Sequence, residues 1–323
     1  MAMTVKEMSA AIAATHGDSM LVRYCPDVLT DAVHHVSVYE TTWDAWGFGD
    51  GSDPVLALTK AYYECIERVA YKHSGAVTTN GFAAHVSFDL AAEKAKAELV
   101  ERDVFLASWF AQIPPVWLAE QQVEGLIDAW GLECLELLRR SGVNPSFGIC
   151  GVSNGLVTMT GLLDGRSRPN APFAFSAIPG IGTTIESAFR NLILDLMRIN
   201  AGIEAKGREV DGFKVRRING QIAIGETLDH LDYFLELGNA SKMAWYIRQS
   251  STEAPILPDL TITTAEVPVP IKTAFPLSVA RATSPEAQQY FVGSARQDRI
   301  NWSRLANLGV ISGQNLPLVH PIP

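Results

Sequence analysis

The sequence predicts an α+β fold in which strand–helix units repeat along a single domain over residues 1–323. The composition, 47% hydrophobic and 19% charged, is that of a folded protein with a substantial core. Stretches rich in β-branched residues, such as Val33–Tyr39, alternate with long helical stretches that are mostly apolar. No low-complexity segment divides the chain, so one domain is the simplest interpretation.

In the first third of the chain, the signals for two long helices are the clearest. Ser52 or Asp53 can cap the first of them, with Pro54 at the first helical position, where its missing N–H is not needed. Asp89 can cap the second. The expected elements are a helix at 4–15, a strand at 33–39, a glycine-rich turn at 46–51, a helix from 54 to about 72 and a helix from 89 to about 110.

The rest of the chain repeats the order of strand, glycine turn and helix. Asn154-Gly155 is a hairpin signal between two buried strands, and the prolines within 250–275 predict an extended segment. The expected elements are a helix at 118–140, two strands within 147–163, a strand at 171–178, a turn at 179–184, a helix to about 205, a helix at 228–237, a strand at 277–282, a helix at 285–293 and a proline-rich tail at 316–323.

One pattern occurs twice: Glu, two apolar residues, Glu, Arg, any residue, an apolar residue and an aromatic residue. Its copies are Glu64–Tyr71 and Glu98–Phe105. Residues three and four apart share a helix face, so the two Glu and the Arg of each copy line up. The other faces are apolar, which predicts helices buried on most of their surface. Carboxylates on such helices need partners.

Two interpretations of this pattern are open. In one, the helices lie at the surface, and each intrahelical Glu–Arg pair contributes only about 0.3–0.5 kcal/mol. In the other, which two copies embedded in apolar residues favour, four carboxylates and two arginines bind Mg²⁺ and a phosphate-bearing nucleotide. Asp195 and Arg198, three apart on a later helix, repeat the theme. A Walker-type site is excluded, because the chain has no Gly-x-x-x-x-Gly-Lys-Ser/Thr loop.

Charge and cysteine usage exclude several other classes. A formal net charge of −9 argues against nucleic acid or an anionic membrane surface as a partner. The four cysteines lack Cys-x-x-Cys spacing, as expected for reduced thiols in the cytoplasm. There is no run of about 18 apolar residues and no signal peptide at the N-terminus, so we expect a cytoplasmic protein without a membrane span.

The stretch from Leu58 to Trp109 resembles the core of the YcaO family, ATP-dependent enzymes that modify backbone amides of peptides. Later residues extend the resemblance over nearly the whole chain, although Lys60, Asp195 and Arg198 stand where family members commonly have Ser, Glu and Gln. The matching pieces are Glu64-x-x-Glu67-Arg68, Asn80-Gly-Phe-Ala-Ala84, Glu98-x-x-Glu101-Arg102-Asp103, Asp195-x-x-Arg198, Val279-Ala-Arg281-Ala and the tail Pro317-x-x-x-Pro321-x-Pro323.

The resemblance implies a YcaO-like domain with a carboxylate-rich site for ATP and Mg²⁺, in which a Cys, Ser or Thr side chain of a ribosomal precursor peptide closes to a thiazoline or oxazoline. It assigns roles as follows: Glu64, Glu67, Glu98, Glu101 and Asp195 hold Mg²⁺; Arg68, Asn80, Arg102, Arg198 and Arg281 bind ATP; and the terminal carboxylate of Pro323 is the base.

The resemblance also implies partners. The chain has no recognisable leader-binding or E1-like domain, so we expect a separate protein of that kind to deliver the precursor peptide, giving a hetero-oligomer. A flavin-dependent dehydrogenase that oxidises azolines is a further candidate partner. Two alternatives stay open: thioamide or amidine formation by the same ATP chemistry, and a non-catalytic YcaO-like scaffold or regulatory protein.

Overall fold

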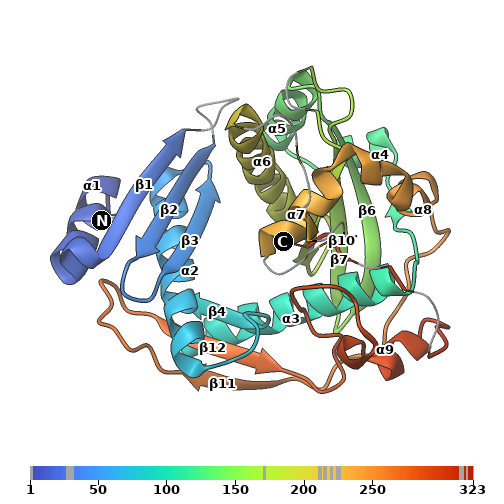
Figure 1. Cartoon of the computed structure of the whole chain (residues 1–323). Coiled ribbons are helices and arrows are strands. Elements are labelled where there is room, and N and C mark those ends of the chain that lie inside the picture. The colour runs from blue at the N-terminus through green and yellow to red at the C-terminus, as the bar shows by residue number, and fades with distance from the viewer. Residues whose placement is uncertain are drawn as a thin grey trace. The chain divides into compact units, whose positions relative to one another are not determined.

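The computed structural model describes residues 3–26, 33–169, 172–209, 213, 217–218, 221–222, 227–312, 316–317 and 319–322. The chain forms two compact units (Figure 1): unit 1 is Met1–Leu99 with Ile262–Ser284, and unit 2 is Val100–Thr261 with Pro285–Pro323. Both units mix helices and strands, which confirms the predicted α+β class. The organisation as one catalytic domain stays a prediction.

Unit 1 contains two antiparallel three-stranded sheets, in the orders β1-β2-β3 and β11-β12-β4. Helix α3 begins in this unit and continues into unit 2. The elements of unit 1 are α1 (Val5–His16), the 3₁₀ turn η1 (Gly17–Ser19), β1 (Met20–Pro26), β2 (His34–Glu40), β3 (Ala45–Gly51), α2 (Pro54–Ser74), β4 (Phe82–His85), the first half of α3 (Phe88–Phe110), β11 (Thr263–Val267) and β12 (Ser278–Thr283).

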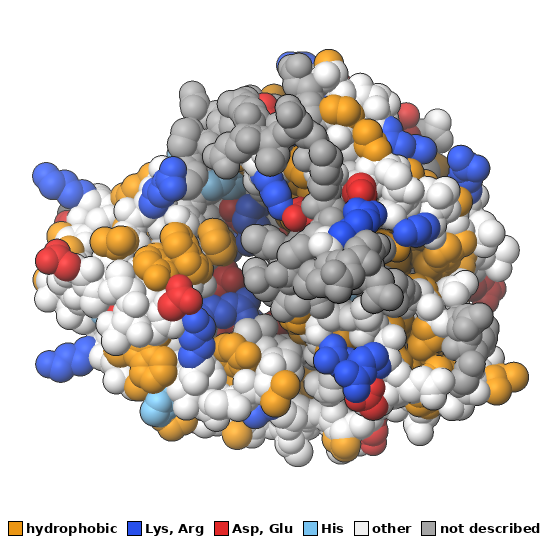
Figure 2. Space-filling view, in the orientation of Figure 1, with side chains coloured by type: hydrophobic (Ala, Val, Ile, Leu, Met, Phe, Trp, Pro, Cys, Tyr) orange, Lys and Arg blue, Asp and Glu red, His pale blue; other side chains and the backbone are white. Residues whose placement is uncertain are grey.

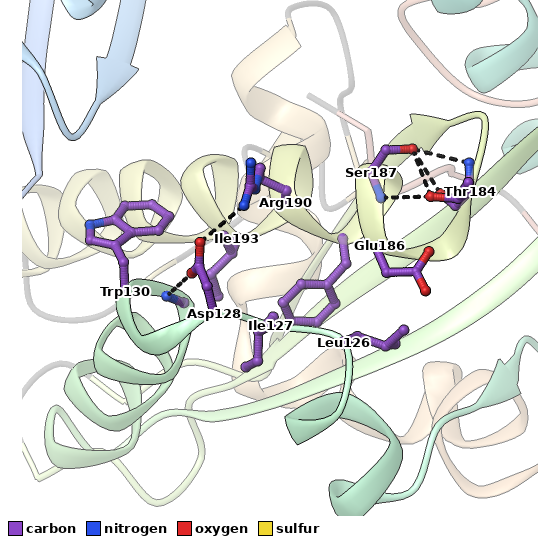
Figure 3. Close-up of a pocket in the computed structure, with 11 residues that line it drawn as sticks. Leu126, Ile127, Asp128, Trp130, Thr184, Glu186, Ser187, Arg190 and Ile193 are labelled. Atoms are coloured by element: carbon purple, nitrogen blue, oxygen red, sulfur yellow. Dashed lines mark hydrogen bonds and ion pairs between the residues drawn. The ribbon is translucent and has the colours of Figure 1, made fainter.

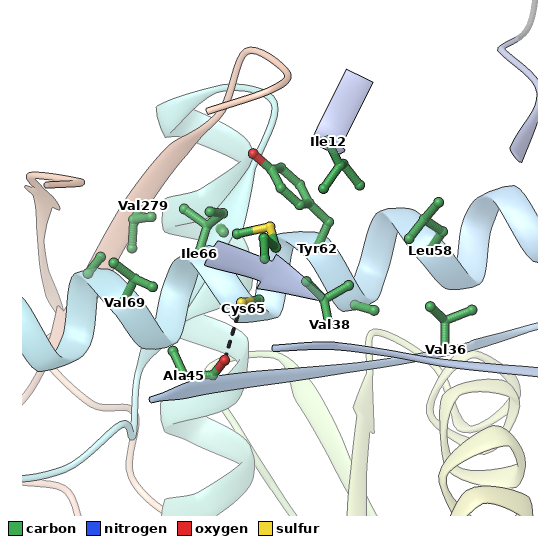
Figure 4. Close-up of a cluster of buried hydrophobic side chains, with 14 of the residues drawn as sticks. Ile12, Val36, Val38, Ala45, Leu58, Tyr62, Cys65, Ile66, Val69 and Val279 are labelled. Atoms are coloured by element: carbon green, nitrogen blue, oxygen red, sulfur yellow. Dashed lines mark hydrogen bonds between the residues drawn. The ribbon is translucent and has the colours of Figure 1, made fainter. Parts of the chain in front are cut away.

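The core of unit 1 lies between α2 and the sheet β1-β2-β3 (Figure 4). Leu58, Cys65 and Ile66 of α2 are fully buried and belong to one cluster with Val36 and Val38 of β2. Asp53 caps α2 by accepting from the backbone N–H of Val55 at 2.6 Å, and Pro54 takes the first helical position, as predicted. A capped helix with one apolar side therefore lies flat on this sheet.

The glycine-rich segment before α2 is a strand, not the predicted turn. Ala45–Gly51 forms β3 and pairs with β2 along its whole length. A Cβ on Gly47 would lie 2.1 Å from the Ala61 carbonyl oxygen, and one on Gly49 would lie 1.9 Å from that of Ala57. The glycines are needed because the backbone of α2 touches the backbone of β3.

The opposite face of β3 carries aromatic side chains that are open to solvent. Trp46 is 46% exposed and Phe48 is 45% exposed. Trp46 stacks on Tyr39 of β2, with ring centroids 4.3 Å apart, which stabilises the strand pair. Figure 2 shows hydrophobic side chains gathered over the strands of unit 1, at the left of the view.

Unit 2 is built on the antiparallel sheet β5-β6-β7-β8. The predicted hairpin is confirmed: β6 and β7 turn at Asn154 and Gly155, which both have positive φ. The elements are the second half of α3, β5 (Val116–Trp117), α4 (Glu120–Glu124), α5 (Ala129–Arg140), β6 (Asn144–Ser153), β7 (Leu156–Asp164), β8 (Phe175–Gly182), α6 (Ile185–Glu209), β9 (Arg217–Ile218), β10 (Gln221–Ile222), α7 (Thr227–Leu235), η2 (Leu237–Met243), α8 (Ala244–Arg248), η3 (Gln297–Arg299) and α9 (Trp302–Ala306).

Three predicted elements of unit 2 are wrong in detail. The helix at 118–140 is two helices, because α4 ends at Gly125 and Asp128 caps α5 by accepting from the Gly131 N–H at 2.9 Å. The turn at 179–184 is mostly strand: β8 continues to Gly182, with α6 lying directly over its glycines. Residues 285–293 form no helix. None of the described helices has the length and apolar content that a bilayer crossing requires.

We predict that Gly47→Ala will strongly destabilise unit 1. The new Cβ would meet the backbone of α2 at 2.1 Å and 2.2 Å, and a backbone neighbour cannot rotate away. Overpacking of this kind should cost about 3 kcal/mol or more, measured by urea unfolding. Gly202→Ala in α6 is the control: a Cβ there has no neighbour within 4 Å, so the variant should gain up to about 1 kcal/mol. Equal stability of Gly47→Ala and the wild type would contradict the close contact.

Candidate functional site

Helix α2 holds the first Glu-Arg set in a hydrogen-bonded arrangement with the edge of β3. The Glu64 carboxylate accepts from the Phe48 backbone N–H at 2.9 Å. Its other oxygen lies 3.3 Å from Arg68 Nη2, and Arg68 Nη1 lies 3.8 Å from Glu67 Oε1. Glu67 is the most enclosed of the three, with a side chain that is 12% exposed, against 28% for Glu64.

Three carboxylates of unit 1 act on one another electrostatically. Burial raises the pKa of Glu67 well above its ordinary 4.5, and the charges of Glu98 and Glu64 raise it further. Arg68 and a hydrogen bond with the Ala84 backbone act in the opposite direction. Without a bound cation, Glu67 is therefore held toward its neutral form.

The same carboxylates act on Arg68. Burial by itself would lower the pKa of the Arg68 guanidinium, but Glu67, Glu64 and Glu98 together raise it above its usual value. The structure thus holds Glu64 and Glu67 against Arg68, and Glu98 lies near enough to act on Glu67 and Arg68 electrostatically. Burial and the charges of Glu98 and Glu64 disfavour the ionised form of Glu67 although Arg68 opposes them, so this part of unit 1 favours a further cation.

Asn80 and Arg281 supply polar groups on the sheet β11-β12-β4. Asn80 precedes β4 and is only 4% exposed, yet its side-chain amide has no hydrogen-bond partner among the described residues. Arg281 of β12 pairs with Phe82 of β4 and places its guanidinium 5.4 Å from the centre of the Phe82 ring. Arg281 Nε is likewise buried without a partner in the described part of the chain. Buried polar atoms of this kind fit a polar ligand.

In unit 2, the second half of α3 carries Glu101 and Arg102. Arg102 Nε lies 3.9 Å from Glu101 Oε1, and the guanidinium lies 5.9 Å from the centre of the Tyr290 ring. Arg102 Nη1 is buried and makes no hydrogen bond within the described residues. The next residue, Asp103, is anchored to Arg304 of α9 by a buried ion pair, with Arg304 Nε 3.0 Å from Asp103 Oδ2. This pair fixes the rotation of α3 in unit 2.

Asp195 and Arg198 pair with each other on α6, with Arg198 Nη2 2.9 Å from Asp195 Oδ1. Their side chains are 39% and 36% exposed, so the pair is more exposed to solvent than Glu64 and Glu67. Each helix thus holds its acid and its arginine on one face, as the spacing predicted.

Residues 319–322 of the proline tail are buried in unit 2. Val319, His320, Pro321 and Ile322 are all buried, and the Trp109 indole N–H donates to the Val319 carbonyl at 3.0 Å. Trp109 belongs to α3, so the tail runs along the helix that carries Glu101 and Arg102. Pro323, the predicted base, lies outside the described residues.

His320 fixes the tail in place through uncharged hydrogen bonds. Its Nε2 donates to the Phe291 carbonyl at 2.7 Å, and its own carbonyl accepts from His230 Nδ1 at 3.0 Å. The two imidazole rings stack, with centroids 4.2 Å apart. Burial, followed by the neighbouring His230, lowers the pKa of His320 to about 3, so this anchor stays neutral at physiological pH.

A pocket of about 290 Å³ in unit 2 has none of the predicted site residues in its lining (Figure 3). It is lined by the start of α5 and the first turns of α6, and Arg190 Nη2 bonds Asp128 Oδ2 across it at 3.0 Å. Because Asp128 also caps α5, this pair has a structural role in holding two helices together.

Comparison with known families identifies the chain. The family model described as YcaO cyclodehydratase, ATP- and Mg²⁺-binding, matches residues 68–267, more than half of the 323 residues. This chain belongs to the YcaO family. The predicted membership is confirmed, and ATP and Mg²⁺ are the cofactors of a YcaO chain. The matched range contains Glu98, Glu101 and Asp195, whereas Glu64 and Glu67 precede it.

Solved structures of YcaO proteins share the fold. The YcaO from Methanopyrus kandleri bound with AMPPCP and Mg²⁺ aligns with a TM-score of 0.54 at 12% identity, covering 84% of this chain and 86% of that chain. The E. coli microcin synthetase McbBCD complex with pro-MccB17 bound aligns with a TM-score of 0.60 at 10% identity, covering 82% and 88%. No curated protein matches the sequence.

The residues of unit 1 fit Mg²⁺ and a nucleotide. A divalent cation would stabilise the ionised form of Glu67, which burial and the charges of Glu98 and Glu64 disfavour. Among the described residues, the side-chain amide of Asn80 and Nε of Arg281 have no hydrogen-bond partner and can bind polar ligand atoms. Within the described ranges, no three His, Cys, Asp or Glu side chains already have the geometry of a metal site. Glu64 is instead engaged with Phe48 and Arg68, so it would have to turn to bind the ion.

Sequence reasoning missed groups that come from distant positions. The Phe48 N–H, the Ala84 backbone and the ring of Tyr290 contact the predicted residues, but no helix spacing points to them.

We predict that Glu67→Gln will change how the stability of the ligand-free protein depends on pH. The folded protein binds the Glu67 proton more tightly than the unfolded chain does, because folding raises this pKa above 4.5. The stabilisation is therefore full below pH 4.5 and is lost as the pH rises through the raised pKa. Gln cannot lose a proton, so the variant should keep its urea midpoint as the pH rises above 4.5, where the wild type declines.

Glu93→Gln is the matched control for this measurement. Glu93 lies on α3 and pairs with Lys96 at 2.8 Å on an exposed face. Its substitution should leave the pH dependence of the wild type unchanged. Parallel loss of stability in the wild type and Glu67→Gln would show that the Glu67 pKa is not raised.

Proposed function

We propose that this YcaO protein is an ATP-dependent peptide cyclodehydratase that converts Cys, Ser or Thr residues of a ribosomal precursor peptide to thiazolines or oxazolines. The observation that carries the proposal is the carboxylate set of unit 1 in a member of the YcaO family. Glu67 is kept beside Glu64 and within electrostatic reach of Glu98, although burial, followed by the charges of these two carboxylates, raises the Glu67 pKa. A protein with no cation to bind would gain stability by losing them.

We assign the residues as follows. Mg²⁺ would be held by Glu64, Glu67 and Glu98 of unit 1 and by Glu101 and Asp195 of unit 2. ATP would be bound by Arg68, Asn80 and Arg281 of unit 1 and by Arg102 and Arg198 of unit 2. When bound, ATP with Mg²⁺ supplies a phosphoryl group that turns a poor leaving group into a good one. The residues of the chain would position the nucleotide and the peptide and would compensate the negative charge of the phosphates.

The reaction balances as the loss of one water from the peptide and the hydrolysis of one ATP. The thiol or hydroxyl adds to the preceding backbone carbonyl and gives up its proton. The carbonyl oxygen is phosphorylated and departs as phosphate. The amide nitrogen loses its proton as the ring C=N bond forms. Arginines near the departing oxygen stabilise its charge, and one base is needed for the protons.

The tail supports azoline formation over thioamide or amidine formation. Val319 and His320 are buried and hydrogen-bonded beside α3, so the residues before Pro323 are held in one conformation. Because the preceding residues are already ordered, positioning a carboxylate at Pro323 would cost little further conformational entropy. We propose that it is the base, as the resemblance implied.

We propose that a second protein delivers the peptide. The E. coli neighbour is a complex, McbBCD, with pro-MccB17 bound, which supports a hetero-oligomer containing a leader-binding, E1-like partner. A flavin-dependent dehydrogenase is a further proposed partner. ATP use and the free thiols of Cys65, Cys134 and Cys150 fit the cytoplasm, which is the compartment we propose.

We predict that Glu67→Gln and Glu101→Gln will each lower ATP turnover by about a hundredfold or more, because each removes a ligand charge from Mg²⁺. Phosphate release is measured with the partner protein and the precursor peptide present, and mass spectrometry follows the loss of one water per ring. Glu93→Gln should keep wild-type turnover. Wild-type turnover in either site variant would refute the metal assignment. ATP turnover with unchanged peptide mass would refute cyclodehydration.

We predict that one glycine appended after Pro323 will lower peptide modification by about 10- to 100-fold. The extension moves the carboxylate by about 3.5 Å and removes no packing. Nucleotide affinity and thermal stability should match the wild type, because the buried tail residues are untouched. Deleting His320 to Pro323 is a less direct test, since it also removes buried hydrogen bonds. If the extended protein modifies peptide at the normal rate, the carboxylate is not the base.

A further inference from the structure

Residues 285–301 form an irregular segment of unit 2 that is attached to a carboxylate of α3. Apart from the short η3, this segment contains no helix or strand, so its backbone has to be held by other hydrogen bonds. The Asp103 carboxylate accepts from the Gln288 backbone N–H at 2.7 Å and from Arg304 Nε at 3.0 Å. Gln288 is fully buried, and its side-chain oxygen accepts from the Asn301 N–H at 2.8 Å. The segment is therefore fixed to α3 next to the proposed site residues of that helix.

The middle of this segment, residues 290–293, contacts the proline tail, and we call it the clamp. The Phe291 carbonyl accepts from His320 Nε2 at 2.7 Å, and the Gly293 N–H donates to His230 Nε2 at 2.9 Å. The same His230 ring donates from Nδ1 to the His320 carbonyl at 3.0 Å. A neutral imidazole has one donor and one acceptor nitrogen, as these two bonds require, and burial lowers the pKa of His230. His230 thus links the clamp to the tail with both of its ring nitrogens.

The clamp also contacts an arginine that is proposed to bind ATP. The centre of the Tyr290 ring lies 5.9 Å from the Arg102 guanidinium and 5.3 Å from the centre of the His320 ring. A base must come within about 3 Å of the atom whose proton it takes, so its place relative to the nucleotide has to be fixed. Prolines make a terminal segment stiff but do not attach it to the rest of the protein. The clamp supplies that attachment.

We propose that the clamp positions the C-terminal carboxylate for proton transfer, with Gln288 and His230 as its positioning residues. The inference rests on the proposed function, because it explains how the proposed base is held. Gln288 fixes the clamp to α3, and His230 fixes the tail to the clamp. Loss of either attachment would let the carboxylate move away from the reacting atoms, which slows the proton transfer without removing a group that binds ATP or peptide.

The first measurement compares His230→Phe with the wild type, since this variant keeps a ring beside His320 and loses both hydrogen bonds. With the partner protein and the precursor peptide present, kcat for peptide modification should fall by about tenfold, followed by mass spectrometry. The KM for peptide, and the affinity for AMPPCP with Mg²⁺ measured by calorimetry, should stay within about twofold of the wild type. His230→Asn keeps an amide N–H near the position of Nδ1, so it should recover most of the loss.

Combination with the glycine appended after Pro323 separates positioning from support of the fold. The carboxylate is already displaced in the extended protein, so His230→Phe should cost less than about twofold further. Gln288→Met, which removes the buried amide beneath the clamp, is a second variant and should show the same pattern. Leu235→Ala is the matched control on α7, at the end where the Leu235 carbonyl accepts from the Ala174 N–H at 2.9 Å. It should lower the melting temperature and keep kcat wherever the protein is folded.

Each other result has a distinct meaning. Wild-type kcat in both His230→Phe and Gln288→Met would overturn the inference and leave the proposed function standing, provided that the appended glycine still lowers modification. Equal fold losses from His230→Phe with and without the glycine would assign the clamp a structural role and overturn the inference too. An equal loss of kcat in folded Leu235→Ala would attribute the effect to stability and have the same consequence. If the appended glycine has no effect, the proposed base fails, and the inference fails with it.

Discussion

The burial of Glu67 beside two other carboxylates of unit 1 is the constraint on which the site depends. Burial, followed by the charges of Glu98 and Glu64, raises the pKa of Glu67, and Arg68 opposes this shift without cancelling it. The protein keeps this arrangement by fixing its partners: the Phe48 N–H holds Glu64, and Ala84 holds Glu67. The ligand-free protein is therefore less stable than it could be, because the negative charge of the site is balanced only when a cation binds. The raised Glu67 pKa also means that binding a metal releases a proton.

The backbone contacts beneath the helices set where those charges stand. In unit 1, Gly47 and Gly49 let α2 lie directly on β3, which brings Glu64 within reach of the Phe48 N–H between them. In unit 2, Gly180 and Gly182 of β8 make the same approach to α6, the helix that carries Asp195 and Arg198. Each unit therefore has a Gly-x-Gly strand under a helix that pairs an acid with an arginine, four residues apart for Glu64 and Arg68 and three apart for Asp195 and Arg198.

The sequence predicted the parts of the site that follow from helix periodicity. The spacing of Glu64, Glu67 and Arg68 places them on one face in the structure, and Asp53 caps the helix as expected. Helix periodicity does not show which residues pack against a helix face, so the sequence could not predict the contact of Glu67 with the Ala84 backbone. The segment 46–51 was wrongly predicted to be a turn. In the sequence, glycines that allow a helix to approach a strand cannot be distinguished from glycines that form a turn. The anchoring of the tail by His230 depends on residues ninety positions apart.

The close contact at β3 has a consequence for mutational scanning. Gly47 and Gly49 carry no side chain and contact no ligand, yet any side chain there would collide with α2. A mutational scan that measures only activity would find Gly47 and Gly49 as intolerant of substitution as Glu67. Such a scan would therefore assign the glycines to the catalytic site. A parallel measurement of protein abundance would separate the two groups of positions. Substitutions of the glycines would lower both abundance and activity, whereas substitutions of the site carboxylates would lower activity alone.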